Sequence, residues 1–355
     1  MDGASEGQQK IQTSIHNYQN LLSKQIQFKL GKIPVATNCN ALATICDTTG
    51  RFLKRIMHGT AYMQPTVGAL ERYNVTLNNV IETLEFVALI ANTAPEKLSD
   101  CSFIDEHFTL YRWYAPDDRY ETRFPPGHCT FPGCLRITHY TIAKLYGSTH
   151  KTKEHVLPLY EKPLDEKNKK PADILKHTSD YIRFNYGLQS IMHGELNKEQ
   201  AIKKPFAWVL PKEYKDLVRQ GSCMLIFSDG TQMMVEVTAH NGMKGDQSYW
   251  YCAPVANALP NGKKYHHKVR PIPGVSFAGD IKNIGFGKLL CTIGVNQATG
   301  KREAHLGVLM DTGTAFKNNP YHLDLFMGYF EEPLHFQAHS KKFPVSGQVY
   351  ILIKK

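Results

Sequence analysis

The densest group of residues that could do chemistry lies near the C-terminus, over His305–Phe330. An apolar run there ends at Asp311, and a second carboxylate, Asp324, follows between Leu323 and Leu325. A carboxyl group with apolar neighbours tends to have a raised pKa, which suits a general acid that works near neutral pH. The alternative is that both aspartates are turn and cap residues that only accept hydrogen bonds from backbone amides.

Asp311-Thr312-Gly313 also resembles the active-site motif of aspartic proteases. Those enzymes need two such carboxylates that share one proton, and an internal repeat or a symmetric dimer supplies the second. This chain has one Asp-Thr-Gly, and Ser228-Asp229-Gly230 has the wrong order. A protease therefore stays an alternative interpretation.

A metal site has weak support. Only His128, Cys129 and Cys134, in the segment HCTFPGC, lie close enough to suggest zinc, and no second pair with zinc spacing accompanies them. The eight cysteines are otherwise widely spaced. We expect small buried thiols or one disulfide in this segment, and neither a metal nor a cofactor.

Composition narrows the class of protein. The 355 residues favour two domains, and 42% hydrophobic residues exclude a mainly disordered chain. Apolar runs reach only about six residues, far below the roughly 18 of a membrane span. The N-terminal MDGASEGQQKIQTS has no signal-peptide pattern.

The net charge of +10 favours an anionic partner: nucleic acid, a membrane surface or an acidic cell-wall polymer. The segment LPNGKKYHHKVRPIPG (259–274) is basic and aromatic, as a phosphate-binding surface would be. No signature of a nucleic-acid-binding module accompanies it, so a solvated loop is the simpler interpretation.

The elements that must position the two aspartates form an α+β pattern that is mainly β. Apolar residues recur at helical spacing over 77–88, with Thr76 as a cap and Pro95 beyond the end. Residues 161–180 are polar and charge-rich and resemble a surface linker or an excursion between domains. A hairpin is predicted around Ser228-Asp229-Gly230. Its strands and the later ones are expected at 223–227, 232–238, 289–295, 305–310 and 348–353.

Ordered blocks along the chain resemble the membrane-bound lytic murein transglycosylase A family, including its C-terminal three-aspartate domain. The aspartate block, GVLMDTGTAFKNNPYHLDLFMG, is one of them. The others, in order, are NVTLNNVIETLEF, RITHYTIAKLYGS, PLYEKP, HGELN, RQGSCMLIFSDGTQMMVEVTAHNG, AGDIKNIGFGKLL and the closing SGQVYILIKK. The match extends over about residues 50–355.

This resemblance implies a double-psi β-barrel built from both ends of the chain, with a smaller β domain inserted. The expected bounds are 1–145 for the N-terminal helices and first barrel part, 146–255 for the insert, and 256–355 for the remaining barrel. The implied activity is cleavage of the β-1,4 bond between N-acetylmuramic acid and N-acetylglucosamine, which leaves a 1,6-anhydro end. The glycan would lie between the two domains.

The resemblance also implies roles for single residues. Asp324 matches the catalytic acid and base, Asp311 would orient groups, and Asp280 matches the first family aspartate. One carboxyl group suffices because the sugar's own C6 hydroxyl is the nucleophile. The resemblance implies glycan contacts for six residues: Gln220, Gly221, Ser222, Thr141, Asn241 and Asp280. The alternatives are a solvated loop for the 220–222 segment and a plain turn aspartate for Asp280.

Departures from the family pattern accompany the match. The family's Gly-Tyr-Tyr-Thr-Pro is here Thr138-His139-Tyr140-Thr141-Ile142, without the glycine and the proline. Its Gln-Gly-Ser-Gly has Cys223 in place of the last glycine. The segment Ala239–Met243 lacks the lysine that the family has there. Altered glycan contacts imply a changed substrate preference or weaker catalysis.

The implied partner is peptidoglycan, with no nucleic acid, and the implied protein is a monomer of the cell envelope or periplasm, either outer-membrane associated or secreted. A processed periplasmic enzyme, a secreted effector and a phage-borne wall enzyme all fit. A non-catalytic glycan- or nucleic-acid-binding protein is the alternative from another class.

Overall fold

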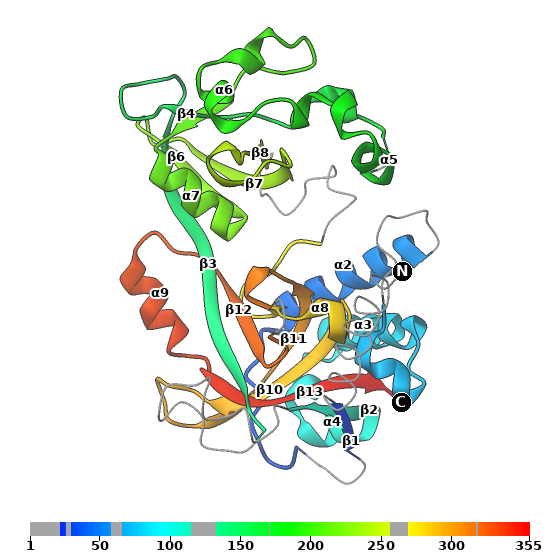
Figure 1. Ribbon diagram of the computed structural model, residues 1–355. Helices are drawn as coiled ribbons and strands as arrows, with labels where there is room; N and C mark the ends of the chain where they lie inside the picture. The colour runs from blue at the N-terminus through cyan, green and yellow to red at the C-terminus, as the bar shows by residue number, and fades with distance from the viewer. Residues whose placement is uncertain are drawn as a thin grey trace. The chain divides into compact units, whose positions relative to one another are not determined.

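The computed structural model describes residues 22–25, 30–57, 66–114, 133–169, 171–255, 269–316 and 319–355. The chain divides into two compact units, and the first comprises Met1–Thr141 together with His267–Lys355. The second unit is Ile142–His266, where the sequence predicted an insert over 146–255. Strand β3 (Leu135–Ser148) passes from the first unit into the second (Figure 1).

The first unit is built on a sheet whose strands come from both ends of the chain. Besides β3, they are β1 (Leu22–Gln25), β2 (Phe108–Trp113), β9 (Ser276–Ala278), β10 (Lys288–Val295), β11 (Arg302–Asp311), β12 (His322–Tyr329) and β13 (Ser346–Lys354). The hydrogen-bonded order β13-β10-β11-β9-β12-β3 returns to β13, because β3 and β13 also pair at Leu135 and Gly347. The strands therefore close into a ring. The double-psi crossover stays a prediction.

Helices cover this ring, and their sequence signals are local. Thr76 begins α3 (Leu77–Thr93) by accepting a hydrogen bond from the Asn79 backbone N–H at 3.3 Å, and Pro95 follows the end as predicted. Asn38 begins α2 (Cys39–Met57) in the same way, through the Ala41 N–H at 3.1 Å.

The two long helices pack against each other, and α3 also packs against β10 and β13. Residues Lys288–Gly294 of β10 are consequently buried along their whole length rather than at alternate positions. The remaining helices of the unit are α4 (Cys101–His107), α8 (Ile281–Ile284) and α9 (Pro333–Ser340), with short 3₁₀ turns η1 (Gly68–Tyr73), η2 (Pro95–Ser99) and η9 (Thr314–Phe316).

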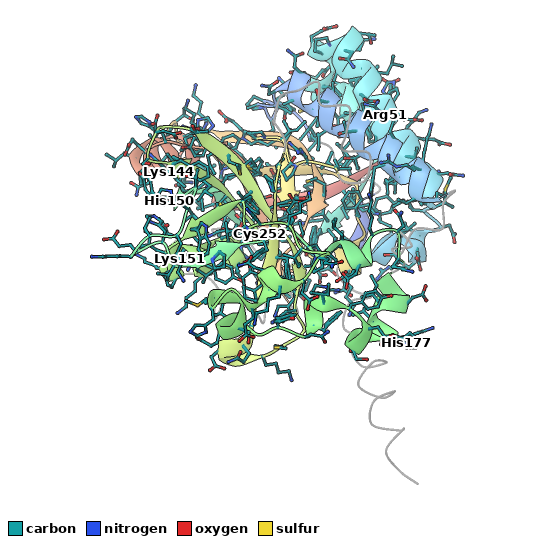
Figure 2. The ribbon with its side chains drawn as sticks, turned by 90° about the horizontal axis from the view of Figure 1, so that it is seen from above. Arg51, Lys144, His150, Lys151, His177 and Cys252 are labelled. Atoms are coloured by element: carbon teal, nitrogen blue, oxygen red, sulfur yellow. The ribbon has the colours of Figure 1, made fainter. Side chains whose placement is uncertain are left out.

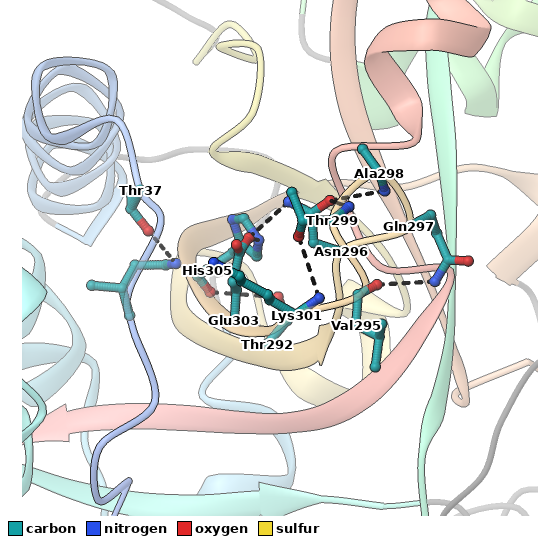
Figure 3. Close-up of polar contacts among 11 residues, drawn as sticks. Thr37, Thr292, Val295, Asn296, Gln297, Ala298, Thr299, Lys301, Glu303 and His305 are labelled. Carbon is teal, nitrogen blue, oxygen red and sulfur yellow. Dashed lines mark hydrogen bonds and ion pairs between the residues drawn. The ribbon is translucent and has the colours of Figure 1, made fainter.

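The turn between β10 and β11 is closed by one side chain (Figure 3). The Asn296 Oδ1 accepts from the N–H groups of Ala298 and Thr299 at 3.0 and 3.1 Å, and its Nδ2 donates to Glu303 at 2.9 Å. Further along β11, the Leu306 N–H donates to the Thr37 hydroxyl at 2.7 Å. These bonds fix the register of the strand that ends at Asp311.

The second unit has its own core around a smaller sheet. The predicted hairpin is confirmed: β6 (Ser222–Phe227) pairs with β7 (Gln232–His240) across the Asp229-Gly230 turn. The other strands are β4 (Leu157–Leu159), β5 (Ala207–Val209) and β8 (Trp250–Pro254). The helical segments are α5 (Pro171–Lys176), α6 (Leu188–Met192), α7 (Pro211–Gln220), η4 (Leu164–Glu166), η5 (Thr178–Asp180), η6 (Ile182–Phe184), η7 (Glu195–Lys198) and η8 (Gly245–Gln247).

The expectation that residues 161–180 form a linker between domains is wrong. The segment lies inside the second unit, and its Glu166 is only 3% exposed. The buried carboxylate accepts from Arg183 Nε at 2.5 Å, and Arg183 also donates to the His240 backbone carbonyl. This buried ion pair holds residues 161–180 against the core of the second unit. The polar composition of the segment does not predict such a contact.

Candidate active site in the first unit

The two predicted aspartates flank one residue of the short central strand β9. Asp311 pairs with Ala278 from the parallel neighbour β11, and Asp324 pairs with Ala278 from the antiparallel neighbour β12. The pairing of β11 with β9 shifts by one residue between Leu309 and Asp311. This irregularity at Met310 brings Asp311, rather than Met310, opposite Ala278, as β-bulges commonly do beside active sites.

Tyr140 of β3 holds the first of these carboxylates. Its hydroxyl donates to Asp311 Oδ2 at 2.8 Å, while the Thr312 backbone N–H donates to Asp311 Oδ1 at 2.8 Å. Burial, and then the charges of Asp311 and Asp324, raise the pKa of Tyr140 far above its usual range. Tyr140 is therefore a neutral donor, and its ring packs 5.1 Å from that of Phe326.

The pKa of Asp324 is raised from 3.8 to about 6, chiefly by burial and further by the charge of Asp311. A hydrogen bond from the Thr138 hydroxyl and the charge of Arg136 oppose this shift. Oδ1 of Asp324 is buried and has no hydrogen-bond partner among the described residues. The carboxyl group thus titrates near neutral pH, as a general acid and base requires, and its Oδ1 is not committed to another group of the described residues.

Two residues near Asp324 are missing from the sequence-based site. The Thr138 hydroxyl lies 2.6 Å from Nε2 of His322, and His322 lies two positions before Asp324 on β12. Burial and the nearby Arg136 lower the pKa of His322 to about 4, so its ring is neutral above that pH. A Thr and a His that are 184 residues apart carry no joint signal in the sequence.

Thr141 and Asp280 also belong to this unit. The Thr141 hydroxyl donates to the Gly328 carbonyl at 2.5 Å and so ties β3 to the end of β12. Asp280 is buried and accepts from the Asn283 N–H at 3.2 Å and from Asn283 Nδ2 at 2.6 Å. Its carboxylate begins α8, which agrees with the alternative of a turn aspartate rather than with a glycan contact.

The second unit contains the other predicted contact residues. Gln220 is exposed at the end of α7, and Gly221 ends that helix in the left-handed conformation, with φ of 79°. Ser222 then begins β6 opposite Glu236. Gln220 and Gly221 are exposed and Ser222 is half-buried. The glycan contact of these three residues stays a prediction.

The expected glycan contact of Asn241 needs correction. Its side chain is 1% exposed, and Nδ2 donates to the carbonyls of Tyr186 and Gln247 at 3.0 and 2.9 Å. Oδ1 accepts from the N–H groups of Met243 and Tyr249 at 3.2 and 2.9 Å. An amide with both donors and both acceptor positions occupied has none left for a ligand, so Asn241 organises the loop before β8.

The possible zinc ligands His128 and Cys129 lie outside the described residues, and the described Cys134 is a buried thiol. Within the described ranges no group of three or more His, Cys, Asp or Glu side chains could hold a metal ion.

No protein-family model and no curated protein matches the chain. Solved structures do match it. A membrane-bound lytic murein transglycosylase from Agrobacterium tumefaciens is similar with a TM-score of 0.54 at 18% identity, over 89% of this chain and 92% of its own. E. coli MltA with bound chitohexaose is similar with a TM-score of 0.56 at 14% identity, over 95% of each chain.

This chain has the MltA fold. The α+β class and the MltA fold are thereby confirmed, and the double-psi barrel stays a prediction. Because the MltA likeness extends over both units, the aspartate pair and the 220–222 segment belong to one fold that is found in lytic transglycosylases.

Proposed function

We propose that this protein is a peptidoglycan lytic transglycosylase that cleaves the β-1,4 bond between N-acetylmuramic acid and N-acetylglucosamine. The observation that carries the proposal is the Asp324 carboxyl group, with a pKa of about 6 and an unpartnered oxygen, beside a second carboxylate fixed by Tyr140. The similar E. coli MltA structure holds chitohexaose, a β-1,4-linked glycan, which supports the same class of substrate here.

Asp324 acts in both halves of the reaction. Its protonated form donates to the glycosidic oxygen, so the bond from that oxygen to C1 of the muramic acid breaks and the glucosamine leaves with a hydroxyl. The C6 hydroxyl oxygen of the muramic acid then attacks C1, and its proton passes to the Asp324 carboxylate. The acid is regenerated and no water is consumed, so a single titrating group suffices.

Asp311 supplies a negative charge that complements the positive charge of the transition state. Two donors, the Tyr140 hydroxyl and the Thr312 N–H, hold its carboxylate in one orientation. A fixed negative charge near C1 stabilises the oxocarbenium-like transition state. It also raises the pKa of Asp324 and so keeps a protonated fraction available near neutral pH.

Cations on the second unit suit a polymer that carries carboxylates. Lys144 and Lys151 lie along one margin of this unit (Figure 2). Lys144 Nζ is 5.8 Å from the centre of the Tyr146 ring, which is 52% exposed, and Lys151 Nζ is 5.8 Å from the centre of the Trp208 ring. Aromatic rings of this kind stack on sugars, and the ammonium groups attract the lactyl and peptide carboxylates.

The proposed location is the cell envelope, where peptidoglycan lies, and the proposed form is a monomer. None of the helices in the described part of the chain is long and apolar enough to cross a membrane.

The test uses purified sacculi. The wild-type chain should release soluble muropeptides, Asp324→Asn should release almost none, and Asp229→Asn, in an exposed turn outside the site, should behave as wild type. Retention on sacculi without release would favour a non-catalytic glycan-binding protein. Salt-dependent retention on DNA, without any on sacculi, would favour a nucleic-acid-binding one.

A further inference from the structure

Three histidines from different elements surround the ring of Phe343. His139 lies on β3, His305 on β11 and His339 on α9, and their ring centres lie 6.1, 5.2 and 5.8 Å from the ring centre of Phe343. Phe343 itself lies in the loop between α9 and β13. We call these four residues the Phe343 cluster. The cluster joins β3, β11 and α9 through one aromatic side chain.

The strands that the cluster joins also carry a contact of the proposed active site. Tyr140 directly follows His139 on β3, and its hydroxyl donates to Asp311 at the end of β11. These two strands are not neighbours in the sheet. Around the ring, β9 and β12 separate them in one direction, and β10 and β13 separate them in the other. A second link between β3 and β11 therefore helps to hold the Tyr140 hydroxyl on Asp311.

The loop that carries Phe343 also leads into the closure of the ring. Two residues after Phe343, the Val345 carbonyl accepts a hydrogen bond from the Ile137 N–H at 2.9 Å. Ser346 then pairs with Arg136, where β13 meets β3. Release of Phe343 would loosen the segment on which this closure depends.

We propose that the Phe343 cluster is an acid-sensitive clamp, which holds β3 for the contact of Tyr140 with Asp311 while its three imidazoles are neutral and opens as they become protonated. The catalytic meaning of the clamp rests on the proposed function. The clamp itself can be tested whether or not the protein cleaves glycans.

Buried nitrogen atoms make the cluster sensitive to acid. Nε2 of His139 and both ring nitrogens of His305 are buried and have no hydrogen-bond partner among the described residues. Protonation of either ring places a positive charge, and an N–H group without an acceptor, inside the packed cluster. Opening exposes the imidazole to water and removes this cost.

The pKa values of the three histidines agree with this packing. Burial lowers the pKa of His139 to about 4 although the Pro344 carbonyl opposes the shift, and the neighbouring His305 and His339 lower it further. Burial is also the largest cause that lowers the pKa of His305 and that of His339. All three imidazoles are therefore harder to protonate in the closed cluster than in water.

Two charged side chains act on the cluster from the elements around it. Glu303 on β11 lies 3.8 Å from Nε2 of His305 and opposes the lowering of its pKa. Lys342, in the same loop as Phe343, lowers the pKa of His339 further. An imidazolium beside an aromatic ring also gains a cation–π attraction, but the lowered pKa values show that burial outweighs it.

The direction of the pH effect follows from the two pKa values of His139. They are 6.5 for the ordinary histidine and about 4 in the closed cluster, so opening takes up a proton between these values. The clamp is therefore fully stable above about pH 6.5 and weakens as the pH falls toward 4.

Hydrogen-exchange mass spectrometry of the full-length wild type tests the clamp without any substitution. After correction for the intrinsic exchange rate at each pH, the opening constant of residues 333–345 should rise by about 20-fold between pH 7 and pH 5 from His139 alone. Helix α3, which belongs to the same unit, is the internal control and should stay equally protected. Equal protection of residues 333–345 at both pH values would overturn the proposal.

Substitutions then assign the effect to the cluster. His139→Phe keeps an aromatic ring and removes the titrating group, so the rise in the opening constant at pH 5 should shrink by about the same 20-fold. His335→Phe changes an exposed histidine of α9 and is the matched control, which should respond to acid as the wild type does. An acid response that is unchanged in His139→Phe, or lost in His335→Phe, would contradict the role of the cluster.

Failure of the proposed function would appear separately, as no release of muropeptides by a wild type whose clamp still opens at pH 5. Where the wild type is active, the acid limb of its kcat/KM profile should move to lower pH in His139→Phe and stay in place in His335→Phe. An acid limb that does not move in His139→Phe would overturn the link between the clamp and the contact of Tyr140 with Asp311.

Discussion

Asp311 and Asp324 lie in register with the same residue, Ala278, on opposite sides of strand β9. One strand therefore separates the two carboxylates. Asp311 is close enough for its charge to raise the pKa of Asp324, while the Tyr140 hydroxyl bonds Asp311. The two carboxyl groups therefore lie close together but have different environments. Pairs of aspartates with different environments take different roles, one as the acid and the other as a stabilising charge.

Replacing each aspartate by asparagine should separate these roles. Asp324→Asn cannot exchange the catalytic proton, so activity on peptidoglycan should fall by about 10²–10⁴-fold or more. Asp311→Asn should cost less in rate at the optimum, and it should shift the alkaline limb of the pH profile to lower pH because the charge that raises the Asp324 pKa is removed. Initial rates between pH 4 and 8 would measure both effects. Survival of activity in Asp324→Asn with its loss in Asp311→Asn would mean that the acid is misassigned, as the protease alternative requires.

The raised pKa of Asp324 also predicts a stability effect. The folded state disfavours the ionised Asp324 carboxylate. The resulting loss in the free energy of unfolding is absent below pH 3.8 and complete above about pH 6. Asp324→Asn should therefore increase the free energy of unfolding at pH 7 by up to about 3 kcal/mol, and the gain should disappear near pH 3.8. Urea unfolding of both proteins at the two pH values measures this difference. An equal gain in the free energy of unfolding at both pH values would contradict the raised pKa of Asp324.

Tyr140→Phe tests whether the tyrosine acts through Asp311. The variant removes one hydrogen bond to a charged group, so kcat/KM should fall by about 10- to 100-fold with little change in folding. In an Asp311→Asn background the same substitution should cost much less, because the group it positions is already altered. Equal losses in the two backgrounds would give Tyr140 a role independent of Asp311.

Asn241 and Gln220 offer a matched pair in the second unit. Asn241→Ala removes four side-chain hydrogen bonds from a buried loop and should lower the free energy of unfolding by about 2–4 kcal/mol. Gln220→Ala changes an exposed helix end and should stay within about 0.5 kcal/mol, while weakening glycan binding. Denaturation curves and binding of a soluble chitooligosaccharide distinguish the two. Normal stability of Asn241→Ala would restore a ligand-binding role for Asn241.

The sequence predicted the elements whose signals are local. The Thr76 cap, Pro95 beyond the helix end and the Asp229-Gly230 hairpin depend on residues within a few positions of one another. The apolar neighbours of Asp324 likewise predicted its raised pKa, because burial is the largest cause of that shift.

Features that depend on pairing between distant strands escaped prediction. The irregularity at Met310 that brings Asp311 opposite Ala278 exists only in the pairing of β11 with β9. Thr138 and His322 meet because β3 lies beside β12. The family resemblance implied a glycan contact for Asn241, and the sequence does not distinguish a loop asparagine that faces solvent from one that is buried among backbone groups.

Mass spectrometry of sacculi digested in ¹⁸O-enriched water tests the central claim most directly. If Asp324 passes the C6 hydroxyl proton and no water attacks C1, the muropeptides should end in 1,6-anhydromuramic acid and contain no ¹⁸O from the solvent. Reducing-end products that carry ¹⁸O would show that water is the nucleophile, which would make the protein a hydrolase and contradict the account.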